Sequence, residues 1–168
     1  MYLLDSNVWI TFLRKPHSPV VPRLQARMPA EIRVCSVVVG ELYYGCLRSA
    51  KPGDNRTKVD ALIAPYSSLA FDDRVADRFA TLRRHLETLG TPIGPYDLQI
   101  AAIALVNSCT LVTHNTAEFS RVQDFSSKTG SCHDGPLEVS LHCHLAVPIP
   151  GDVRHATLCT ERVPSGEL

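Results

Sequence analysis

Short apolar segments alternate with helical patterns along most of this chain, and this alternation constrains the fold more than any other feature of the sequence. The apolar segments that fit short strands are Tyr2-Leu3-Leu4, Ile32–Cys35, Ser68–Phe71 and Leu111–Thr113. Strands that alternate with helices are typical of βαβ units. The sequence therefore predicts an α/β fold in three layers, α/β/α, around a central and mostly parallel sheet. In such sheets, ligands bind at the carboxyl ends of the strands.

The segments between the strands show helical spacing. Helices are expected over residues 8–13, 20–28, 37–49, 55–64, 74–89 and 96–107. Ser6 or Asn7 is the predicted N-cap of the first helix, and Ser36 is the predicted N-cap of the third. Residues 51–54 contain Pro and Gly, and we expect them to break the chain between the third and fourth helices.

The helix over residues 74–89 has the clearest amphipathic pattern, and Gly90 supplies its C-terminal stop. Its polar side carries Arg74, Arg78, Arg83 and Arg84. A row of arginines opposite an apolar stripe is typical of a solvated helix face. We favour that interpretation over a dedicated RNA-contact surface.

The composition changes near residue 126. Phe125 is the last aromatic residue, and four of the seven histidines lie beyond it. We therefore expect one domain over residues 1–126 and a divergent, poorly ordered tail over residues 127–168. The first segment carries 14 Lys and Arg against 12 Asp and Glu, so its surface would be basic if four of the acids were gathered at one site.

The sequence gives no indication of a membrane or secretory segment. No apolar run is long enough to cross a bilayer, and Asp5 interrupts the N-terminal apolar stretch too early for a signal peptide. Cys35, Cys46 and Cys109 lie in apolar stretches and fit reduced core residues. We expect the protein to be cytoplasmic.

The tail contains residues of the types that bind zinc. They are Cys132-His133, His142-Cys143-His144, His155 and Cys159. Their spacing matches no zinc-finger pattern, and an alternating strand would place the two histidines of the central group on one side and its cysteine on the other. Incidental composition is the preferred explanation.

Four carboxylates occupy positions from which they can converge. Asp5 ends the first strand, Glu41 lies on the helix after the second, Asp97 lies in the first turn of a later helix, and Glu118 follows the last strand. Clustered carboxylates repel one another unless a cation neutralises them, and oxygen ligands favour Mg²⁺ or Mn²⁺ over zinc. Such ions activate water and stabilise leaving oxyanions, so phosphodiester hydrolysis is the expected chemistry.

Each acid also has a structural explanation when it is taken alone. Asp5 and Asp97 can stabilise helix N-termini, and Glu41 can be an exposed helix residue. Apolar neighbours such as Leu3-Leu4 make solvent exposure less convincing for these acids.

Four segments together resemble the motif blocks of VapC-type PIN-domain toxins, in order and at suitable spacing over about residues 1–125. They are Tyr2-Leu3-Leu4-Asp5-Ser6-Asn7-Val8, Ser36-Val37-Val38-Val39-Gly40-Glu41-Leu42-Tyr43-Tyr44-Gly45, Gly94-Pro95-Tyr96-Asp97-Leu98-Gln99-Ile100-Ala101-Ala102 and Leu111-Val112-Thr113-His114-Asn115-Thr116-Ala117-Glu118-Phe119. The resemblance implies a PIN-like α/β/α domain and a metal-dependent endoribonuclease. It also implies a small cognate antitoxin as partner, in a homodimer or a toxin–antitoxin hetero-oligomer.

The resemblance also assigns roles to residues. Asp5, Glu41 and Asp97 would hold Mg²⁺ or Mn²⁺ and the activated water, and Glu118 would complete the acidic set. Ser6, where related sequences often have Thr, would orient Asp5 through its hydroxyl. Asn115 would be a neutral helper at a place where related nucleases often have Asp. The tail departs from the family, whose members usually end soon after the segment that matches Arg121-Val122, and a frameshifted or fused reading frame would produce such an ending.

Two alternatives belong to other function classes. A PIN-like module that binds RNA or protein without cutting would be expected to lack one or more of the acids. Haloacid-dehalogenase-like phosphatases also begin with a strand that ends in Asp, but their chemistry needs a second Asp where this chain has Asn7. No Gly-rich phosphate-binding or dinucleotide-binding loop is present, so nucleotide binding has no support.

Overall fold

The computed structural model describes residues 1–15, 17–18 and 20–128 of the 168-residue chain. In this part of the chain, one sheet contains β1 (Tyr2–Leu4), β2 (Ile32–Cys35), β3 (Ser67–Leu69) and β4 (Thr110–Val112). The strand order is β3-β2-β1-β4, and every neighbouring pair is parallel. The parallel sheet predicted from the sequence is confirmed.

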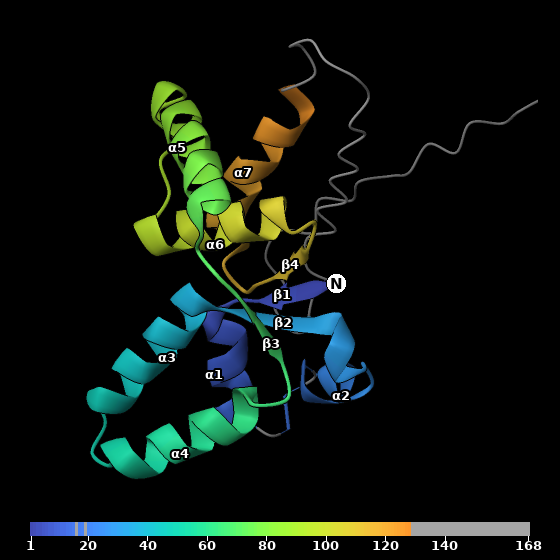
Figure 1. Ribbon diagram of the computed structural model, residues 1–168, viewed down its shortest axis with the longest axis vertical. Helices are drawn as coiled ribbons and strands as arrows, with labels where there is room; N and C mark the ends of the chain where they lie inside the picture. Colours follow the sequence, from blue (N-terminus) through green and yellow to red (C-terminus); the bar gives the residue numbers. More distant parts are fainter. Residues whose placement is uncertain (16, 19, 129–168) are drawn as a thin grey trace, which may run out of the picture.

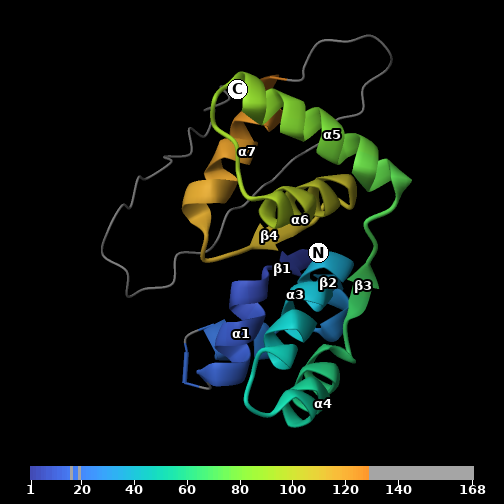
Figure 2. The same cartoon turned by 90° about the vertical axis from the view of Figure 1, so that its left-hand side faces the viewer.

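Helices cover both faces of the sheet. They are α1 (Ser6–Arg14), α2 (Val20–Gln25), α3 (Ser36–Leu47), α4 (Pro52–Ile63), α5 (Asp73–Thr88), α6 (Pro95–Val106) and α7 (Thr116–Lys128), with a short 3-10 turn at Pro29–Glu31. Figure 1 shows α1, α3 and α4 below the sheet and α5, α6 and α7 above it, and the turned view in Figure 2 shows the same three layers. The fold is therefore the expected α/β/α arrangement.

The strand order reverses direction next to β1. From β1 the chain steps to β2 and then to β3, and it crosses back through α5 and α6 to place β4 on the other side of β1. Leu3 pairs with Arg33 of β2 on one side and with Leu111 of β4 on the other. The carboxyl ends of β1 and β4 thus border the topological switch point, which is where open α/β sheets bind ligands.

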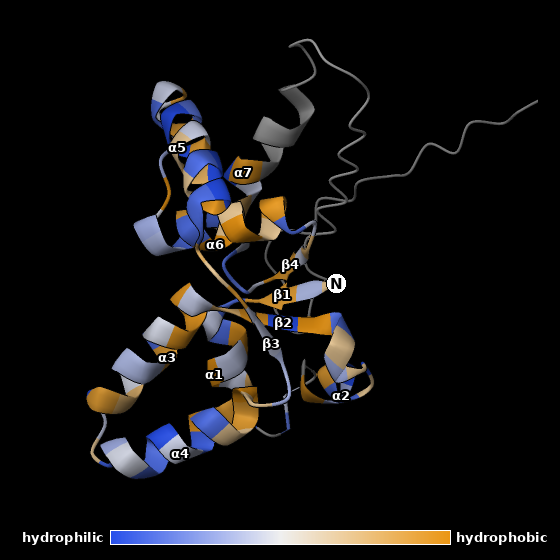
Figure 3. Cartoon of the chain, in the orientation of Figure 1, coloured by the Kyte–Doolittle hydropathy of each residue, from blue (hydrophilic) through white to orange (hydrophobic). Residues whose placement is uncertain are grey.

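The core lies between the sheet and the helices. Leu3 and Leu4 are fully buried, and five consecutive residues of α6, Ile100 to Ala104, are buried as well. Figure 3 shows α6 as strongly hydrophobic, whereas α5 above it is largely hydrophilic on the side that faces the viewer. Cys35, Cys46 and Cys109 are free and buried, which confirms their prediction as core thiols.

The predicted boundaries were wrong at the beginnings of three helices. Asp5 is the N-cap of α1, where Ser6 or Asn7 was expected, and its carboxylate accepts a hydrogen bond from the Ser6 N–H. Cys35 is the N-cap position of α3. Ser36, predicted for that role, instead accepts a hydrogen bond through its hydroxyl from the Phe71 N–H.

The third error concerns residues 51–54, which were expected to interrupt the chain. Pro52 is the first residue of α4. Proline fits this position because the first helical residue needs no N–H donor and the fixed φ of proline suits a helix. The segment therefore separates α3 from α4, as predicted, but α4 already begins at Pro52 within it.

The predicted domain boundary at residue 126 falls inside α7, which continues to Lys128. The tail over residues 127–168, including the zinc-capable residues at 132–159, lies outside the described residues apart from this helix end. In the part of the chain that the structure describes, every helix is too short or too polar to span a membrane.

Candidate active site

Asp5 lies at the junction of β1 and α1, at the switch point of the sheet. Its side chain is only 3% exposed. The Ser6 N–H donates to Oδ1 at 2.6 Å, and the Thr113 hydroxyl donates to Oδ2 at 2.8 Å. Burial raises the pKa of Asp5 above its ordinary value, and the two hydrogen bonds oppose that rise because they favour the ionised form. Asp5 is therefore a buried carboxylate held in one orientation.

Glu41 reaches the same site from the middle of α3. The hydroxyl of Ser6 donates a hydrogen bond to Glu41 Oε2. Ser6 was expected to orient Asp5 through its hydroxyl, but only its backbone N–H contacts Asp5, and the hydroxyl contacts Glu41 instead. Ser6 thus connects two of the predicted acids, because its backbone binds one and its side chain binds the other.

Asp97 lies in the first turn of α6, and Asn115 contacts it. Asn115 Nδ2 donates to Asp97 Oδ2 at 2.9 Å, and the Asn115 N–H donates to the Thr113 hydroxyl at 2.9 Å. Thr113 in turn contacts Asp5, so a chain of hydrogen bonds runs from Asp97 through Asn115 and Thr113 to Asp5. These contacts place Asn115 beside the acids, and its role as a neutral helper stays a prediction.

The pKa of Asp97 is raised to about 6. Burial is the largest cause, and the negative charges of Asp5, Glu118 and Glu41 follow in that order. The hydrogen bond from Asn115 lowers the pKa but does not cancel these effects. The three other predicted acids are therefore close enough for their charges to act on Asp97.

Glu118 occupies a different position from the other three acids. Its Oε2 accepts a hydrogen bond from the Gly94 N–H at 3.3 Å, and its Oε1 lies 3.8 Å from Nη1 of Arg121. The same arginine donates to the carbonyl of Pro92 at 2.8 Å. Glu118 thus lies near Asp97 but fastens the loop before α6 to α7, and it does not line the cleft described next.

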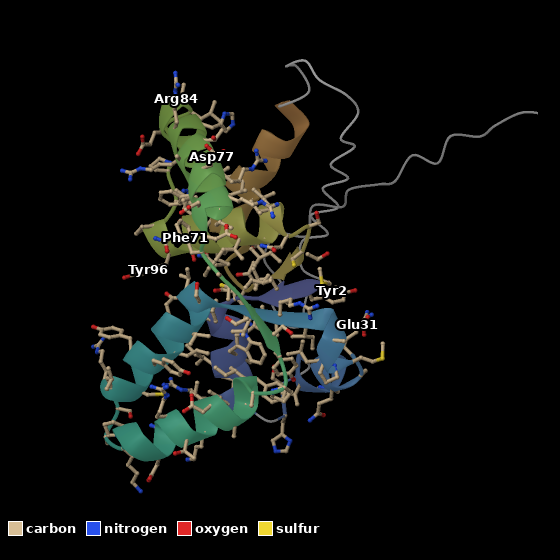
Figure 4. All side chains as sticks on the ribbon, in the orientation of Figure 1. Tyr2, Glu31, Phe71, Asp77, Arg84 and Tyr96 are labelled. Carbon is tan, nitrogen blue, oxygen red and sulfur yellow. The ribbon has the colours of Figure 1, made fainter. Side chains whose placement is uncertain are left out.

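Three of the acids line an open cleft of about 1070 Å³. Its walls come from α1, α3 and α6, and its acidic lining residues are Asp5, Glu41 and Asp97. The other polar and aromatic lining residues are Ser6, Asn7, Arg14, Ser36, Tyr44, Arg48, Ser49, Tyr96 and Gln99. Figure 4 shows the labelled Tyr96 reaching outward from the beginning of α6, beside the layer that contains α3.

Thr113 was placed in a strand by the sequence but was not recognised as part of the site. It is one of three buried polar or charged residues in the described part of the chain, with Asp5 and Ser6. Its position would have identified it. Thr113 is a hydroxyl residue directly after the apolar strand β4, and β4 pairs with β1 at the switch point. The pairing of β1 with β4 was not predictable from the chain order alone.

The donor set fits a divalent cation. Among the described residues, no three His, Cys, Asp or Glu side chains already stand close enough together to enclose an ion. Mg²⁺ needs no such enclosure, because it retains several waters and is commonly bound by one or two carboxylates. A cation would also favour the ionised form of Asp97, which the neighbouring carboxylates disfavour.

The fold and this cleft define the class of protein as an α/β/α domain with a carboxylate site at the switch point of a parallel sheet. The chain belongs to the PIN-domain family, which matches residues 2–124, and it is a VapC-type member of that family.

The comparisons with individual proteins agree. Ribonuclease VapC2 of Rickettsia felis is 32% identical over 123 residues, which are 73% of this chain and 92% of that protein. The tRNA(fMet)-specific endonuclease VapC of Shigella flexneri is 30% identical over 121 residues, 72% of this chain and 91% of that protein. The solved structure of DNA-bound VapBC from Salmonella typhimurium has a TM-score of 0.68 at 30% identity, covering 72% of this chain and 91% of that chain.

Proposed function

We propose that this chain is a metal-dependent endoribonuclease and the toxin of a toxin–antitoxin pair. The observation that carries the proposal is the cleft at the switch point of a PIN fold, which Asp5, Glu41 and Asp97 line together. The names of the relatives support it, since they are ribonucleases and an RNA endonuclease. We further propose that the protein works in the cytoplasm, where RNA is available.

In this proposal Asp5, Asp97 and Glu41 hold Mg²⁺ or Mn²⁺ and the attacking water. When bound, the cation supplies a Lewis acid that polarises the scissile phosphate and activates water. Thr113 and Ser6 keep the lone pairs of Asp5 and the carboxylate of Glu41 in fixed directions. The ligand set consists of oxygen atoms, so Mg²⁺ and Mn²⁺ are preferred over Zn²⁺.

Asn115 and Glu118 have supporting roles. Asn115 donates to Asp97 and thereby favours the ionised form that binds a cation. Glu118 contributes negative charge from behind Asp97 and holds the Gly94 backbone. Its effect on the site is therefore indirect.

The direct test is cleavage of RNA by the purified full-length chain. Structured RNA should be cut in Mg²⁺ or Mn²⁺ and left intact in EDTA, and Asp97→Asn should abolish cutting while the circular dichroism spectrum stays unchanged. RNA that is bound but never cut in any divalent metal would overturn the nuclease proposal in favour of a non-cleaving binding module.

We also propose that a small antitoxin binds this chain. VapBC-5 from Mycobacterium tuberculosis, a member of the VapBC family of toxin–antitoxin systems, has a solved structure with a TM-score of 0.55 to this chain at 26% identity. The protein encoded next to this chain should co-purify with it, suppress its RNA cleavage and form a hetero-oligomer with it. Without that protein, the chain should form a homodimer. Size-exclusion chromatography with light scattering measures both states.

A further inference from the structure

Two tyrosines on the walls of the cleft are unusually exposed. Tyr44 of α3 is 61% exposed and Tyr96 of α6 is 58% exposed. Among the aromatic residues whose burial the structure describes, only these two are exposed, and both line the cleft of the three acids. Large aromatic side chains are usually buried or half-buried, so two exposed rings at one cleft indicate a ligand with flat apolar faces.

Two arginines line the same cleft. Arg14 ends α1 and Arg48 follows α3, and neither forms an ion pair with any carboxylate in the described part of the chain. The guanidinium of Arg48 lies 5.7 Å from the ring centre of Tyr44. Exposed arginines without a carboxylate partner retain their full positive charge for an anionic ligand, and arginine is suited to binding phosphate.

One acid, one tyrosine and one arginine of the cleft follow one line along α3. Glu41, Tyr44 and Arg48 are spaced by three and then four residues, so they lie on one side of α3 and its C-cap. Seven residues of helix separate Glu41 from Arg48, which is about 10 Å. This distance corresponds to roughly three nucleotides of a stacked strand, so Arg48 would contact a phosphate beyond the scissile one.

Two glycines in α3 leave the same wall open. Gly40 and Gly45 line the cleft, and a Cβ added at either position would meet no atom within 4 Å. Glycine inside a helix is unfavourable relative to alanine, and no packing contact among the described residues requires it at these two places. The space in front of α3 thus remains free for a ligand that approaches the helix backbone.

We propose that Tyr96 and Tyr44 stack on unpaired bases of the RNA in the cleft and that Arg48 and Arg14 bind phosphates beyond the scissile one. Aromatic platforms beside cationic side chains are the recurrent means of binding single-stranded nucleic acid. The bases of an RNA duplex are stacked on each other, so their faces are not accessible to side chains. The inference rests on the proposed RNA-cleaving function and adds the residues that bind the RNA strand beyond the scissile phosphate.

Binding is measured by fluorescence anisotropy of the full-length chain in EDTA, so that no cleavage occurs. The probe is a short fluorescein-labelled oligoribonucleotide of mixed sequence, free or annealed to its complement. The free strand should bind more tightly than the duplex. Tyr96→Ala should weaken binding of the free strand about tenfold, and Tyr96→Phe should restore it because the ring is retained.

The arginines are tested through the salt dependence of the same binding. Arg48→Gln should lower the slope of log affinity against log salt by about 0.7, because one phosphate contact is lost, whereas Tyr96→Ala should leave the slope unchanged. Arg84→Gln is the matched control, since this exposed arginine lies on α5 away from the cleft. A slope that falls equally in both arginine variants would overturn the assignment of Arg48.

The glycines give a test that separates binding from folding. Gly45→Leu should weaken binding of the free strand at least tenfold while the protein melts no lower than the parent, because leucine favours the helix and its Cβ meets no described atom within 4 Å. Gly53→Leu is the matched control, since Gly53 is also in open space but lies on α4 outside the cleft. Equal binding by the two leucine variants would overturn the proposed path along α3.

These outcomes are distinct from failure of the proposed function. RNA cleavage by the parent, combined with unchanged binding in the tyrosine, arginine and glycine variants, would overturn this inference and leave the nuclease intact. Variants that keep their RNA affinity but lose the antitoxin would assign the wall of α3 to the protein partner and would also overturn it.

Discussion

The protein has two surfaces that carry arginines, and they differ in what surrounds each guanidinium. On α5 the arginines alternate with acids of the same helix, and Arg83 donates to Glu87 at 2.8 Å. In the cleft, Arg14 and Arg48 face a site that also contains the three acids, and neither is ion-paired among the described residues. The comparison teaches that arginine content alone does not locate an RNA site, because an arginine such as Arg83 already donates to a carboxylate of its own helix.

The largest expected effect separates these surfaces by activity. Asp5→Asn should lower RNA cleavage by at least about a hundredfold, since a neutral amide can neither balance a cation nor accept as strongly from Thr113. Simultaneous replacement of Arg74, Arg83 and Arg84 by Gln should change cleavage by less than about twofold at physiological salt. Both variants are assayed on the same RNA, with circular dichroism to confirm folding.

The opposite result would reverse the comparison. Full activity in Asp5→Asn would show that the switch-point acids are not the site, and a large loss in the α5 variant would show that α5 contacts RNA after all.

A second prediction repeats one substitution in both regions. Thr113→Val removes the hydroxyl that donates to Asp5, and metal affinity should fall about 10- to 100-fold because the ligand is no longer oriented. Thr81→Val on α5 removes a hydroxyl that donates only to the Asp77 carbonyl, and affinity should not change. Titration of each folded protein with Mn²⁺, followed by calorimetry, gives both constants. Equal constants would show that Thr113 has no positioning role.

The third prediction uses pH. The folded-state pKa of Asp97, about 6, lies above the unfolded value of about 3.9, so the folded metal-free protein binds more protons between these values. The melting temperature of the metal-free protein should therefore rise as the pH falls from 7 to 5. Asp97→Asn should reduce this rise, because the burial and the repulsion that raise the pKa no longer act on an ionisable group.

Cation binding should show the opposite pH trend. Protons and Mg²⁺ compete for the same ionised carboxylates, so stabilisation by Mg²⁺ should be greater at pH 7 than at pH 5. A melting temperature that falls steadily from pH 7 to pH 5 in the metal-free protein would contradict the raised pKa of Asp97. Replacement of the exposed Asp54 on α4 by Asn is the control, and it should leave both trends as they are in the parent.

The sequence predicted the elements well because their periodicity is local. The strands and the long α5 and α6 follow from apolar spacing within each segment, and the acids stand out because they follow such segments. What failed depends on contacts between distant segments. Ser6 was assigned to Asp5, its neighbour, whereas its hydroxyl contacts Glu41 on α3, 35 residues away. Thr113 is 108 residues from Asp5 and becomes its partner only when β4 pairs with β1.

The arginines of the cleft were missed for the same reason. Arg14 and Arg48 are single basic residues at helix ends, with no local pattern that sets them apart, whereas the row on α5 is conspicuous. Their common position at one cleft appears only when α1 and α3 pack side by side. A pattern within one helix therefore draws attention to the arginines of α5. It cannot reveal a cleft wall that two helices, α1 and α3, form together.

The smallest expected effect concerns the segment after α7. A chain that stops after Lys128 should fold and should cleave RNA within about twofold of the full chain, because the described residues of both arginine surfaces all lie before residue 129. The buried residues Phe119 and Val122 already close the core against α5 and α6, and the PIN-domain match ends at residue 124. Removal of residues 129–168 therefore leaves in place every described residue of the core and of the cleft. Thermal unfolding and cleavage of the shortened and full chains measure this directly. Insolubility of the shortened chain, beside a stable full chain, would show that the last segment completes the fold and that the comparison of the two surfaces must include it.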